Sequence, residues 1–378
     1  MSELKVMTIV GTRPEIIRLA RVIARLDATE GVEHRLVHTG QNHDPALKDV
    51  FFDDLGLRAP DHYLDVDTSS LGAVLGGVLM ATERVLMAER PDAVVVLGDT
   101  NSCIAAVIAK RMRIPVYHLE AGNRCFDENV PEETNRRLVD HVADFNLAYT
   151  EHARRNLLSE GLHPRRVVVI GSPMREVLDH ARSGIDASDV VGRLGLTPQR
   201  YFLASAHREE NVDSPERLRM LLEVLGAVHR RFGYPVVVST HPRTRRRLEE
   251  AGDLGSDDIR WLEPFGFHDY NRLQLDAACV LSDSGTISEE SAILGFPAVT
   301  LRDSIERPEA LDAGTILMTG LDADDAERAV AVAMAEAPSS MPEGYDVADT
   351  SSRVVRFILS TAGRHHTWSG IRVPEGDR

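Results

Sequence analysis

The chain has 378 residues, of which 43% are hydrophobic and 27% charged, so it is long enough for two globular domains of ordinary size. Its formal net charge of −16 argues against nucleic acid or an anionic membrane as a partner. The three cysteines (Cys103, Cys125 and Cys279) have no metal-binding spacing, which argues against a zinc site or a disulfide framework. No charged leader precedes the first strand-like segment, and no apolar run approaches membrane-spanning length. We therefore expect a cytoplasmic protein without a metal site.

Short apolar runs alternate with amphipathic helical segments along the whole chain. In the first half the predicted strands are 4–10, 34–38, 93–97, 116–119, 143–149 and 167–171. In the second half they are 201–206, 236–240, 259–262, 280–283 and 298–301. This alternation predicts right-handed crossovers and parallel sheets. The expected fold class is α/β, with doubly wound domains at 1–172 and 173–360 and a tail at 361–378 that has no clear element.

The segment 282–309 carries the clearest functional signal. A small polar turn, Ser282–Thr286, separates an apolar strand from a segment with helical spacing, Ile287–Leu294. The backbone N–H groups of such a turn and the helix dipole together form an anion site. Glu289 and Glu290 at the same helix start suit a ribose diol rather than a phosphate, and Arg307 returns a positive charge. The pattern predicts a nucleotide.

Charged residues follow several strands of the first half. Arg13 comes after the first strand, where open α/β sheets bind ligands, although a solvated arginine fits this position equally well. Asp99 and Glu120 follow two further strands at the same predicted edge, and Glu132 and Glu133 come shortly afterwards. Crowded carboxylates have raised pKa values and can move a proton. The alternatives are a helix cap for the first pair and a solvated helical turn for the second.

Basic residues follow two strands of the second half. His207 and Arg208 come after one strand, and His241 and Arg243 come after the next. A histidine beside an arginine at a strand end favours contact with phosphate, whereas Arg245–Arg247 fit a solvated helix face better. The chain has neither the GxGxxG pattern of dinucleotide sites nor the GxSxG pattern of a nucleophilic serine.

Nine short segments, in order and at compatible spacings, match one enzyme family. They are GTRPE (11–15), HTGQ (38–41), GDT (98–100), HLEAG (118–122), PEETNR (131–136), GSP (171–173), AHREEN (206–211), DSGTISEE (283–290) and RDSIERPE (302–309). On these segments the chain resembles the non-hydrolysing UDP-N-acetylglucosamine 2-epimerases over residues 4–360.

The resemblance implies a glycosyltransferase-B-type fold, in which two Rossmann-like domains flank the active site. It also implies a homodimer and a UDP-sugar reaction that uses no cofactor. In such enzymes C2 loses its proton as UDP leaves C1, which gives 2-acetamidoglucal. UDP then adds back while C2 is protonated on the opposite face.

The resemblance also assigns roles to individual residues. Asp99, Glu120 and Glu132 match the acid/base carboxylates, and His207 joins them as a catalytic candidate. The UDP-binding residues it implies are Arg13, His207, Ser284, Gly285, Thr286, Glu290 and Arg307. Candidates for a substrate or allosteric contact are Arg18, Gln41, Arg136, Arg208 and His241.

Some segments depart from the family pattern. The loop Asn123–Val130 is short, the nucleotide turn reads DSGT rather than DSGG, and HPRT replaces a histidine–asparagine–proline pattern. The stretches GNRCFDENVPEE, STHPRTR and GFHDYN resemble a sister branch that makes UDP-N-acetyl-L-fucosamine from its 2-epimer. The favoured activity is interconversion of UDP-GlcNAc and UDP-ManNAc, with the fucosamine reaction as the alternative. Three further alternatives are a UDP-sugar-dependent glycosyltransferase, a hydrolysing epimerase and a non-catalytic sensor. The loop is the predicted determinant of the sugar.

Overall fold

The computed structural model describes residues 3–40, 51–252, 258–336 and 340–372. Their contacts divide the chain into two units. Unit 1 contains Met1–Arg124, Pro131–Asp179 and Val347–Arg378, and unit 2 contains Cys125–Val130 and His180–Asp346. The predicted boundary after residue 172 differs from this division in three places. Residues 173–179 and the segment from Val347 onward group with unit 1, and a six-residue loop from the first half groups with unit 2.

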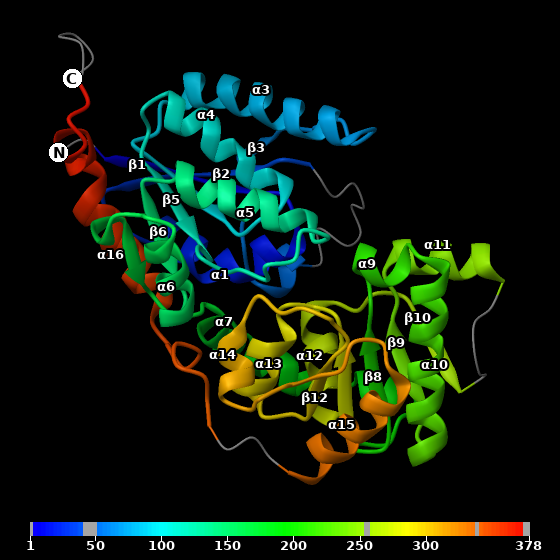
Figure 1. The fold of residues 1–378 in the computed structure, drawn as a ribbon. Helices are drawn as coiled ribbons and strands as arrows, with labels where there is room; N and C mark the ends of the chain where they lie inside the picture. Colours follow the sequence, from blue (N-terminus) through cyan, green and yellow to red (C-terminus); the bar gives the residue numbers. More distant parts are fainter. Residues whose placement is uncertain (1–2, 41–50, 253–257, 337–339, 373–378) are drawn as a thin grey trace. The chain divides into compact units, whose positions relative to one another are not determined.

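Unit 1 is built on a seven-stranded parallel sheet with the order β3-β2-β1-β4-β5-β6-β7 (Figure 1). The strands are β1 (Leu4–Val10), β2 (Val32–His38), β3 (His62–Tyr63), β4 (Ala93–Leu97), β5 (Val116–Leu119), β6 (Phe145–Ala148) and β7 (Val167–Val169). All five residues of β4 are apolar and buried, as expected for a strand with helices on both faces. The sheet is therefore the core of unit 1.

The helices of unit 1 follow the strands in alternation. They are α1 (Arg13–Asp27), η1 (Asn101–Ile104), α3 (Leu71–Glu89), α4 (Ala105–Arg111), α5 (Pro131–Val142), α6 (Glu151–Ser159) and η2 (Pro164–Arg166), and then, after unit 2, α16 (Thr350–Thr361), η3 (Ala362–Arg364) and α17 (His365–Trp368). Helix α7 (Met174–Ala187) begins in unit 1 and ends in unit 2.

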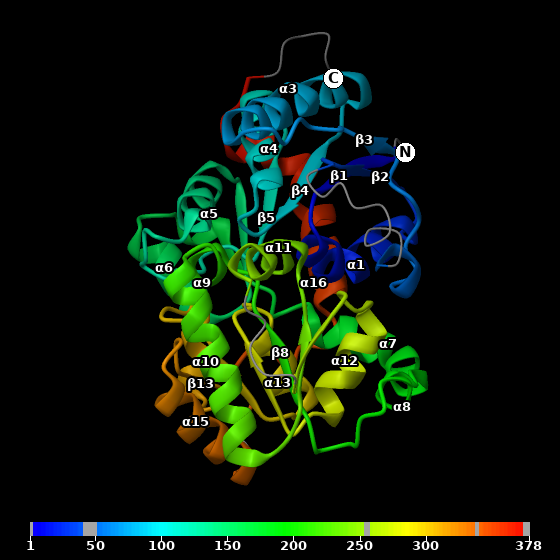
Figure 2. The ribbon, with the colours of Figure 1, turned by 90° about the vertical axis from the view of Figure 1, so that its right-hand side faces the viewer.

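Unit 2 repeats the architecture with a six-stranded parallel sheet, in the order β10-β9-β8-β11-β12-β13. Its strands are β8 (Phe202–Ser205), β9 (Val236–Ser239), β10 (Ile259–Leu262), β11 (Cys279–Ser282), β12 (Ala298–Thr300) and β13 (Leu317–Met318). Its helices are α8 (Val190–Arg193), α9 (Glu209–Val212), α10 (Pro215–Phe232), α11 (Pro242–Ala251), α12 (Phe267–Asp276), α13 (Ile287–Leu294), α14 (Pro308–Asp312) and α15 (Ala323–Ala335). Helices α10 and α15 lie side by side against the sheet (Figure 2). Both units are thus Rossmann-like, which confirms the predicted fold class.

The C-terminal segment belongs to unit 1 because α16 packs against α1. Arg25 Nε donates to Ser351 Oγ at 3.2 Å, and the hydroxyls of Tyr117 and Thr361 are 2.7 Å apart. The tail was expected to carry no element, yet it forms η3 and α17. His365 is buried there and lies 3.3 Å from the carboxylate of Asp144. This packing stabilises a helix that local sequence does not indicate.

Helix α3 is long and apolar enough to cross a membrane, so the expectation that no apolar run approaches this length was wrong. Among the described residues it is the one helix that is so by length and composition, with a mean hydropathy of 1.5 over an 18-residue window. Val74, Val78 and Leu86 are buried in unit 1. Met80 and Met87 are 61% and 57% exposed, so the helix is apolar on its outer face as well as its inner one.

Candidate active site

The two sheets share a strand order that defines a ligand position in each unit. In unit 1 the strands β1 and β4 are neighbours, and their connections leave in opposite directions across the sheet. In unit 2 the same is true of β8 and β11. Ligands of open α/β sheets bind outside the carboxyl ends of the strands at this switch point. Arg13 and Asp99 follow β1 and β4, whereas His207 and Ser284 follow β8 and β11.

Asp99 is held by an arginine rather than crowded by another carboxylate. Arg136, buried on α5, donates to Asp99 Oδ2 from Nε at 3.0 Å and from Nη2 at 2.6 Å. Its Nη1 donates to Glu133 at 3.0 Å, and Glu133 also accepts from Arg137. Arg136 was predicted to contact substrate or an effector, and in the structure it contacts Asp99 and Glu133.

Glu120 lies in an uncommon backbone conformation and also contacts an arginine. Its φ of +64° is in the left-handed region, which non-glycine residues seldom adopt. Its carboxylate forms an ion pair with Arg18 of α1, whose side chain is buried, and Asn123 Nδ2 approaches it at 3.4 Å. Arg18 was another candidate for a substrate or effector contact, and its observed partner is Glu120. Two carboxylates of unit 1 are therefore each paired with one arginine.

A buried cluster supports the segment that carries Glu120. His118 Nδ1 lies 2.9 Å from Asp140, and His118 Nε2 lies 2.8 Å from the carbonyl oxygen of Gly98, next to Asp99. Asp140 also accepts from Gly122 N at 3.1 Å. The cluster ties the residues on either side of Glu120 to helix α5 and to the loop after β4.

Glu15 connects the loop after β1 to the loop after β4. Its carboxylate accepts from Gly11 N at 2.8 Å, from Thr12 N at 2.7 Å and from Thr100 Oγ1 at 3.0 Å. Burial raises the pKa of Glu15, and these hydrogen bonds, together with one from Ser102, partly oppose the rise. The residue fixes the backbone between Arg13 and Asp99, a role that its position in a helix start did not reveal.

In unit 2 two arginines lie close to the polar turn Ser282–Thr286, which was predicted to bind a nucleotide. Arg307 Nη1 donates to Gly285 O at 2.9 Å, and a Cβ added to Gly285 would overlap that same nitrogen. The added Cβ would also lie 3.7 Å from Arg208 Nη2. Ser284 Oγ and Thr286 Oγ1 are 3.0 Å apart in the turn. A larger residue here would have to displace the end of the Arg307 side chain. The turn combines N–H groups, hydroxyls and guanidinium groups, which suits a diphosphate.

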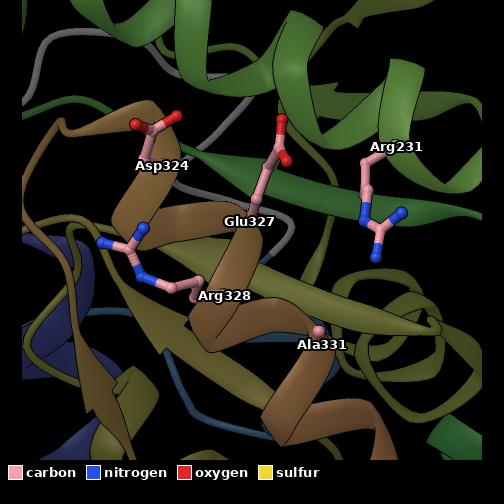
Figure 3. A pocket seen from close by; sticks show the side chains of 5 residues that line it. All are labelled: Arg231, Asp324, Glu327, Arg328 and Ala331. Atoms are coloured by element: carbon pink, nitrogen blue, oxygen red, sulfur yellow. The ribbon is translucent and has the colours of Figure 1, made fainter.

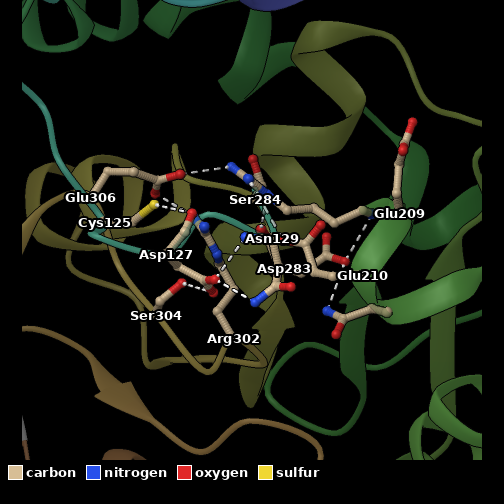
Figure 4. A network of polar contacts seen from close by, with 12 residues as sticks. Cys125, Asp127, Asn129, Glu209, Glu210, Asp283, Ser284, Arg302, Ser304 and Glu306 are labelled. Atoms are coloured by element: carbon tan, nitrogen blue, oxygen red, sulfur yellow. Dashed lines mark hydrogen bonds and ion pairs between the residues drawn. The ribbon is translucent and has the colours of Figure 1, made fainter. Parts of the chain in front are cut away.

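Arg208 is held in place by polar contacts with Asp283 and Glu306. Figure 4 shows these two partners within a larger polar network. Arg208 Nε donates to Asp283 O at 3.1 Å, and its Nη2 lies 3.3 Å from Glu306. Glu306 is buried and also pairs with Arg302. Arg208, predicted as a substrate or effector contact, therefore contacts the polar turn Ser282–Thr286.

The carboxylates after the turn have different partners. Glu289 is buried and lies 3.2 Å from Arg307 Nε. Burial works against the charge of Arg307, yet Glu289 and other nearby acidic groups keep its pKa raised. Glu290 accepts from Gln274 Nε2 at 2.6 Å. Glu289 thus orients Arg307, and Glu290 has a different partner, Gln274.

The comparisons with known proteins identify the family. The family described as UDP-N-acetylglucosamine 2-epimerase matches residues 24–359. The chain belongs to this family. A solved UDP-N-acetylglucosamine 2-epimerase from Rickettsia bellii is 44% identical, with a TM-score of 0.90 and coverage of 98% of this chain and 100% of that one. The Methanocaldococcus jannaschii enzyme, solved in complex with UDP-GlcNAc and UDP, is 33% identical with a TM-score of 0.89, covering 94% and 100%.

The family includes a relative named for another sugar. A UDP-2,3-diacetamido-2,3-dideoxy-D-glucuronate 2-epimerase from Pseudomonas aeruginosa is 32% identical over 359 residues, which cover 94% of this chain and 99% of that protein. Membership of the epimerase family therefore makes this chain an isomerase of UDP-sugars without specifying the sugar.

The remaining predicted site residues of the epimerase have less distinctive surroundings. Arg13 opens α1 with its guanidinium 5.6 Å from the ring centre of Phe51. Glu132 is partly exposed in the first turn of α5. His241 caps α11, accepts from Arg243 N at 3.2 Å, and has its ring centre 6.0 Å from that of His207. Gln41 lies outside the described residues.

A surface hollow of unit 2 contains none of these residues. It has a volume of about 390 Å³ and is lined by five residues of α10 and α15 (Figure 3): Arg231, Asp324, Glu327, Arg328 and Ala331. Its charges are of both signs, and Arg328 pairs with Asp325. We assign it no role in the epimerase reaction.

Proposed function

We propose that the chain is a non-hydrolysing UDP-N-acetylhexosamine 2-epimerase that interconverts UDP-GlcNAc and UDP-ManNAc. The observation that supports this most directly is the pair of arginine-bound carboxylates, Asp99 and Glu120, which follow adjacent strands of unit 1. A transferase that passes the sugar to an acceptor has no need of several carboxylates at C2, so this pattern favours epimerisation.

The reaction requires a base that remains ionised beside the sugar. A carboxylate of unit 1 accepts the proton from C2, the C1–O bond breaks, and its electron pair leaves with UDP. The product on the enzyme is 2-acetamidoglucal. UDP then bonds again to C1, and a different carboxyl group, acting as an acid, returns a proton to the opposite face of C2. Asp99, Glu120 and Glu132 are the proposed acid/base residues, and Arg136 and Arg18 form ion pairs with the first two.

Unit 2 supplies the binding site for the leaving group. The N–H groups and hydroxyls of Ser284, Gly285 and Thr286 are proposed to bind the diphosphate together with Arg307 and His207. Arg13 of unit 1 adds a positive charge, and Glu290 accepts hydrogen bonds from the ribose diol. Charge that develops on UDP is stabilised by these fixed donors.

The loop Asn123–Val130 is proposed to select the sugar. Within unit 2, Asp127 accepts from Ser304 Oγ at 3.3 Å, so the loop contacts the segment that leads to Arg307. Phe126 has a φ of +54° and is 71% exposed. An exposed aromatic ring suits a methyl group at C6 as well as a hydroxymethyl group. The fucosamine-forming reaction therefore remains the alternative substrate assignment.

Product analysis by NMR with UDP-GlcNAc tests the assignment. We expect UDP-ManNAc with no accumulation of free UDP. Stoichiometric release of UDP would indicate hydrolysis or transfer instead, and turnover of UDP-N-acetyl-L-fucosamine alone would move the chain to the sister branch. Glu120→Gln is expected to abolish proton exchange at C2 and to leave UDP binding intact.

We also propose a homodimer formed through the outer face of α3. This face carries Gly76, Met80 and Met87 at helical spacing. It also carries one charge of each sign, from Glu83 and Arg84. A surface of this kind is complementary to itself when two copies meet about a two-fold axis. A second copy of the chain therefore fits the face better than an anionic membrane or nucleic acid, because the protein is strongly acidic.

The free thiols of all three cysteines are consistent with the proposed cytoplasmic location.

Light scattering after gel filtration tests the dimer. Met80→Glu is expected to give a monomer, whereas Leu359→Glu, which changes an exposed leucine on α16, serves as the matched control and is expected to stay dimeric. A monomeric wild-type protein, or a dimer that survives Met80→Glu, would contradict the proposal.

A further inference from the structure

Asp283 is a fully buried carboxylate directly after β11, and its contacts converge on the loop after β8. Its Oδ2 accepts from His207 N at 3.0 Å, from Arg208 N at 3.0 Å and from Asn211 Nδ2 at 3.2 Å. Its Oδ1 lies 3.1 Å from His207 Nδ1. Burial would raise the pKa of Asp283, but the charge and hydrogen bond of His207 and the N–H of Arg208 lower it to about 2. The group is therefore an anion over the whole working pH range.

The contact with the ring has a consequence for the histidine tautomer. An ionised carboxylate can only accept, so the hydrogen in the contact with Asp283 belongs to His207 Nδ1. Nε2 is then the ring nitrogen that can face a ligand. We propose that Asp283 is the positioning residue of His207: it fixes the ring with hydrogen on Nδ1 and directs Nε2 to the departing diphosphate.

Two other side chains near the ring in the described part of the chain, those of His241 and Arg208, have contacts of their own. His241, whose ring centre is 6.0 Å away, accepts through Nδ1 from the backbone of Arg243. Arg208 carries a positive charge and can only donate. Asp283 is thus the neighbouring anion whose geometry orients His207. Because its other oxygen accepts the backbone N–H groups, the carboxylate orients the loop and the ring together.

The role in the reaction rests on the proposed epimerase function. When the C1–O bond breaks, its electron pair moves to the diphosphate oxygen of UDP. An imidazolium that donates from Nε2 stabilises this charge, and the anionic Asp283 stabilises the imidazolium. On return of UDP to C1 the same contacts reverse. Neither step needs a further reactant.

The tautomer can be measured directly in the wild-type protein, without any turnover. Side-chain ¹⁵N–¹H correlation spectra of the ¹⁵N-histidine-labelled protein, with the His207 signals assigned by their loss in His207→Gln, report which nitrogen carries hydrogen. We expect the neutral ring to be protonated on Nδ1. A neutral ring protonated on Nε2 would overturn the proposal even if the epimerase activity is as proposed.

Two variants separate positioning from general support of the loop. In Asp283→Asn we expect a mixed tautomer and a kcat lower by about 10- to 100-fold, a part of what a well-placed proton donor contributes. Asn211→Ser removes a different partner of Asp283, so it is expected to lower the melting temperature and keep the tautomer. On the His207→Gln background, Asp283→Asn should lower kcat little further. An equal loss of kcat with and without the imidazole would show that Asp283 acts on structure alone.

Discussion

A methyl group added at Gly122 tests whether the backbone around Glu120 is as tightly constrained as the structure indicates. Gly122 has a φ of +88°, and an added Cβ would overlap the carbonyl oxygen of Ala153 on α6 and lie 2.8 Å from its carbonyl carbon. Gly161 also has a φ of +88°, yet nothing lies within 4 Å of its added Cβ. Gly161→Ala therefore isolates the cost of the left-handed backbone, and Gly122→Ala adds the overlap.

The two costs can be estimated separately. The left-handed backbone costs alanine about 1–2 kcal/mol, of which roughly 0.4–1 kcal/mol is offset by the lower entropy of the unfolded chain. We expect Gly161→Ala to lose about 1 kcal/mol in the free energy of unfolding. Overpacking adds about 1–3 kcal/mol, so Gly122→Ala is expected to lose about 2–4 kcal/mol.

Urea unfolding followed by circular dichroism measures both losses, and kcat measures the effect on the site. Because Gly122 is two residues from Glu120, we expect its variant to lose activity as well, whereas Gly161→Ala should retain it. Equal losses of stability in the two variants would refute the reasoning, because they would show that α6 moves aside at little cost.

Three further predictions follow from the polar contacts. Arg136→Lys keeps the charge but cannot make both contacts with Asp99, so kcat is expected to fall by up to about 100-fold with little change in KM; an unchanged kcat would count against this positioning role. Gly285→Ala displaces Arg307 and removes a charge-assisted hydrogen bond of about 1.5–3 kcal/mol, so calorimetry should show UDP binding roughly 10- to 100-fold weaker. Retained affinity would mean that the turn tolerates a side chain. The pKa of Asp283 is lowered from 3.8 to about 2 in the folded protein. At pH values above the pKa of the unfolded chain, its ionised form therefore adds about 2 kcal/mol to the free energy of unfolding, and this contribution is lost as the pH falls from 4 to 2. Urea unfolding of wild type and Asp283→Asn should therefore converge over this range, and a constant difference would contradict the assignment.

The sequence pattern predicts most strands of the two sheets because many of them are short apolar runs, such as β4 (Ala93–Leu97). It misses β3 (His62–Tyr63) and β13 (Leu317–Met318), since two residues are too few to show a period. It also misses the return of α16 to unit 1. That packing depends on a contact between residues more than 300 positions apart, such as Arg25 and Ser351.

The candidate site is predicted in its residue types but not in its pairings. Strand ends indicate where Asp99 and Glu120 lie, because parallel strands bring their carboxyl ends to one edge. Their arginine partners come from α5 and α1, which local patterns cannot assign. Asp283 was read only as part of a polar turn, yet it is the residue that orients His207. Its position after a strand that neighbours β8 is the signal that could have revealed this contact.

The central claim is that a proton leaves C2 of the sugar and returns from the opposite face while UDP is released and recaptured. Incubation with UDP-GlcNAc in deuterated water, followed by NMR of the products, measures this directly. The account predicts UDP-ManNAc with deuterium at C2 and no net loss of nucleotide-sugar. UDP-ManNAc formed with retention of the original hydrogen at C2 would contradict it.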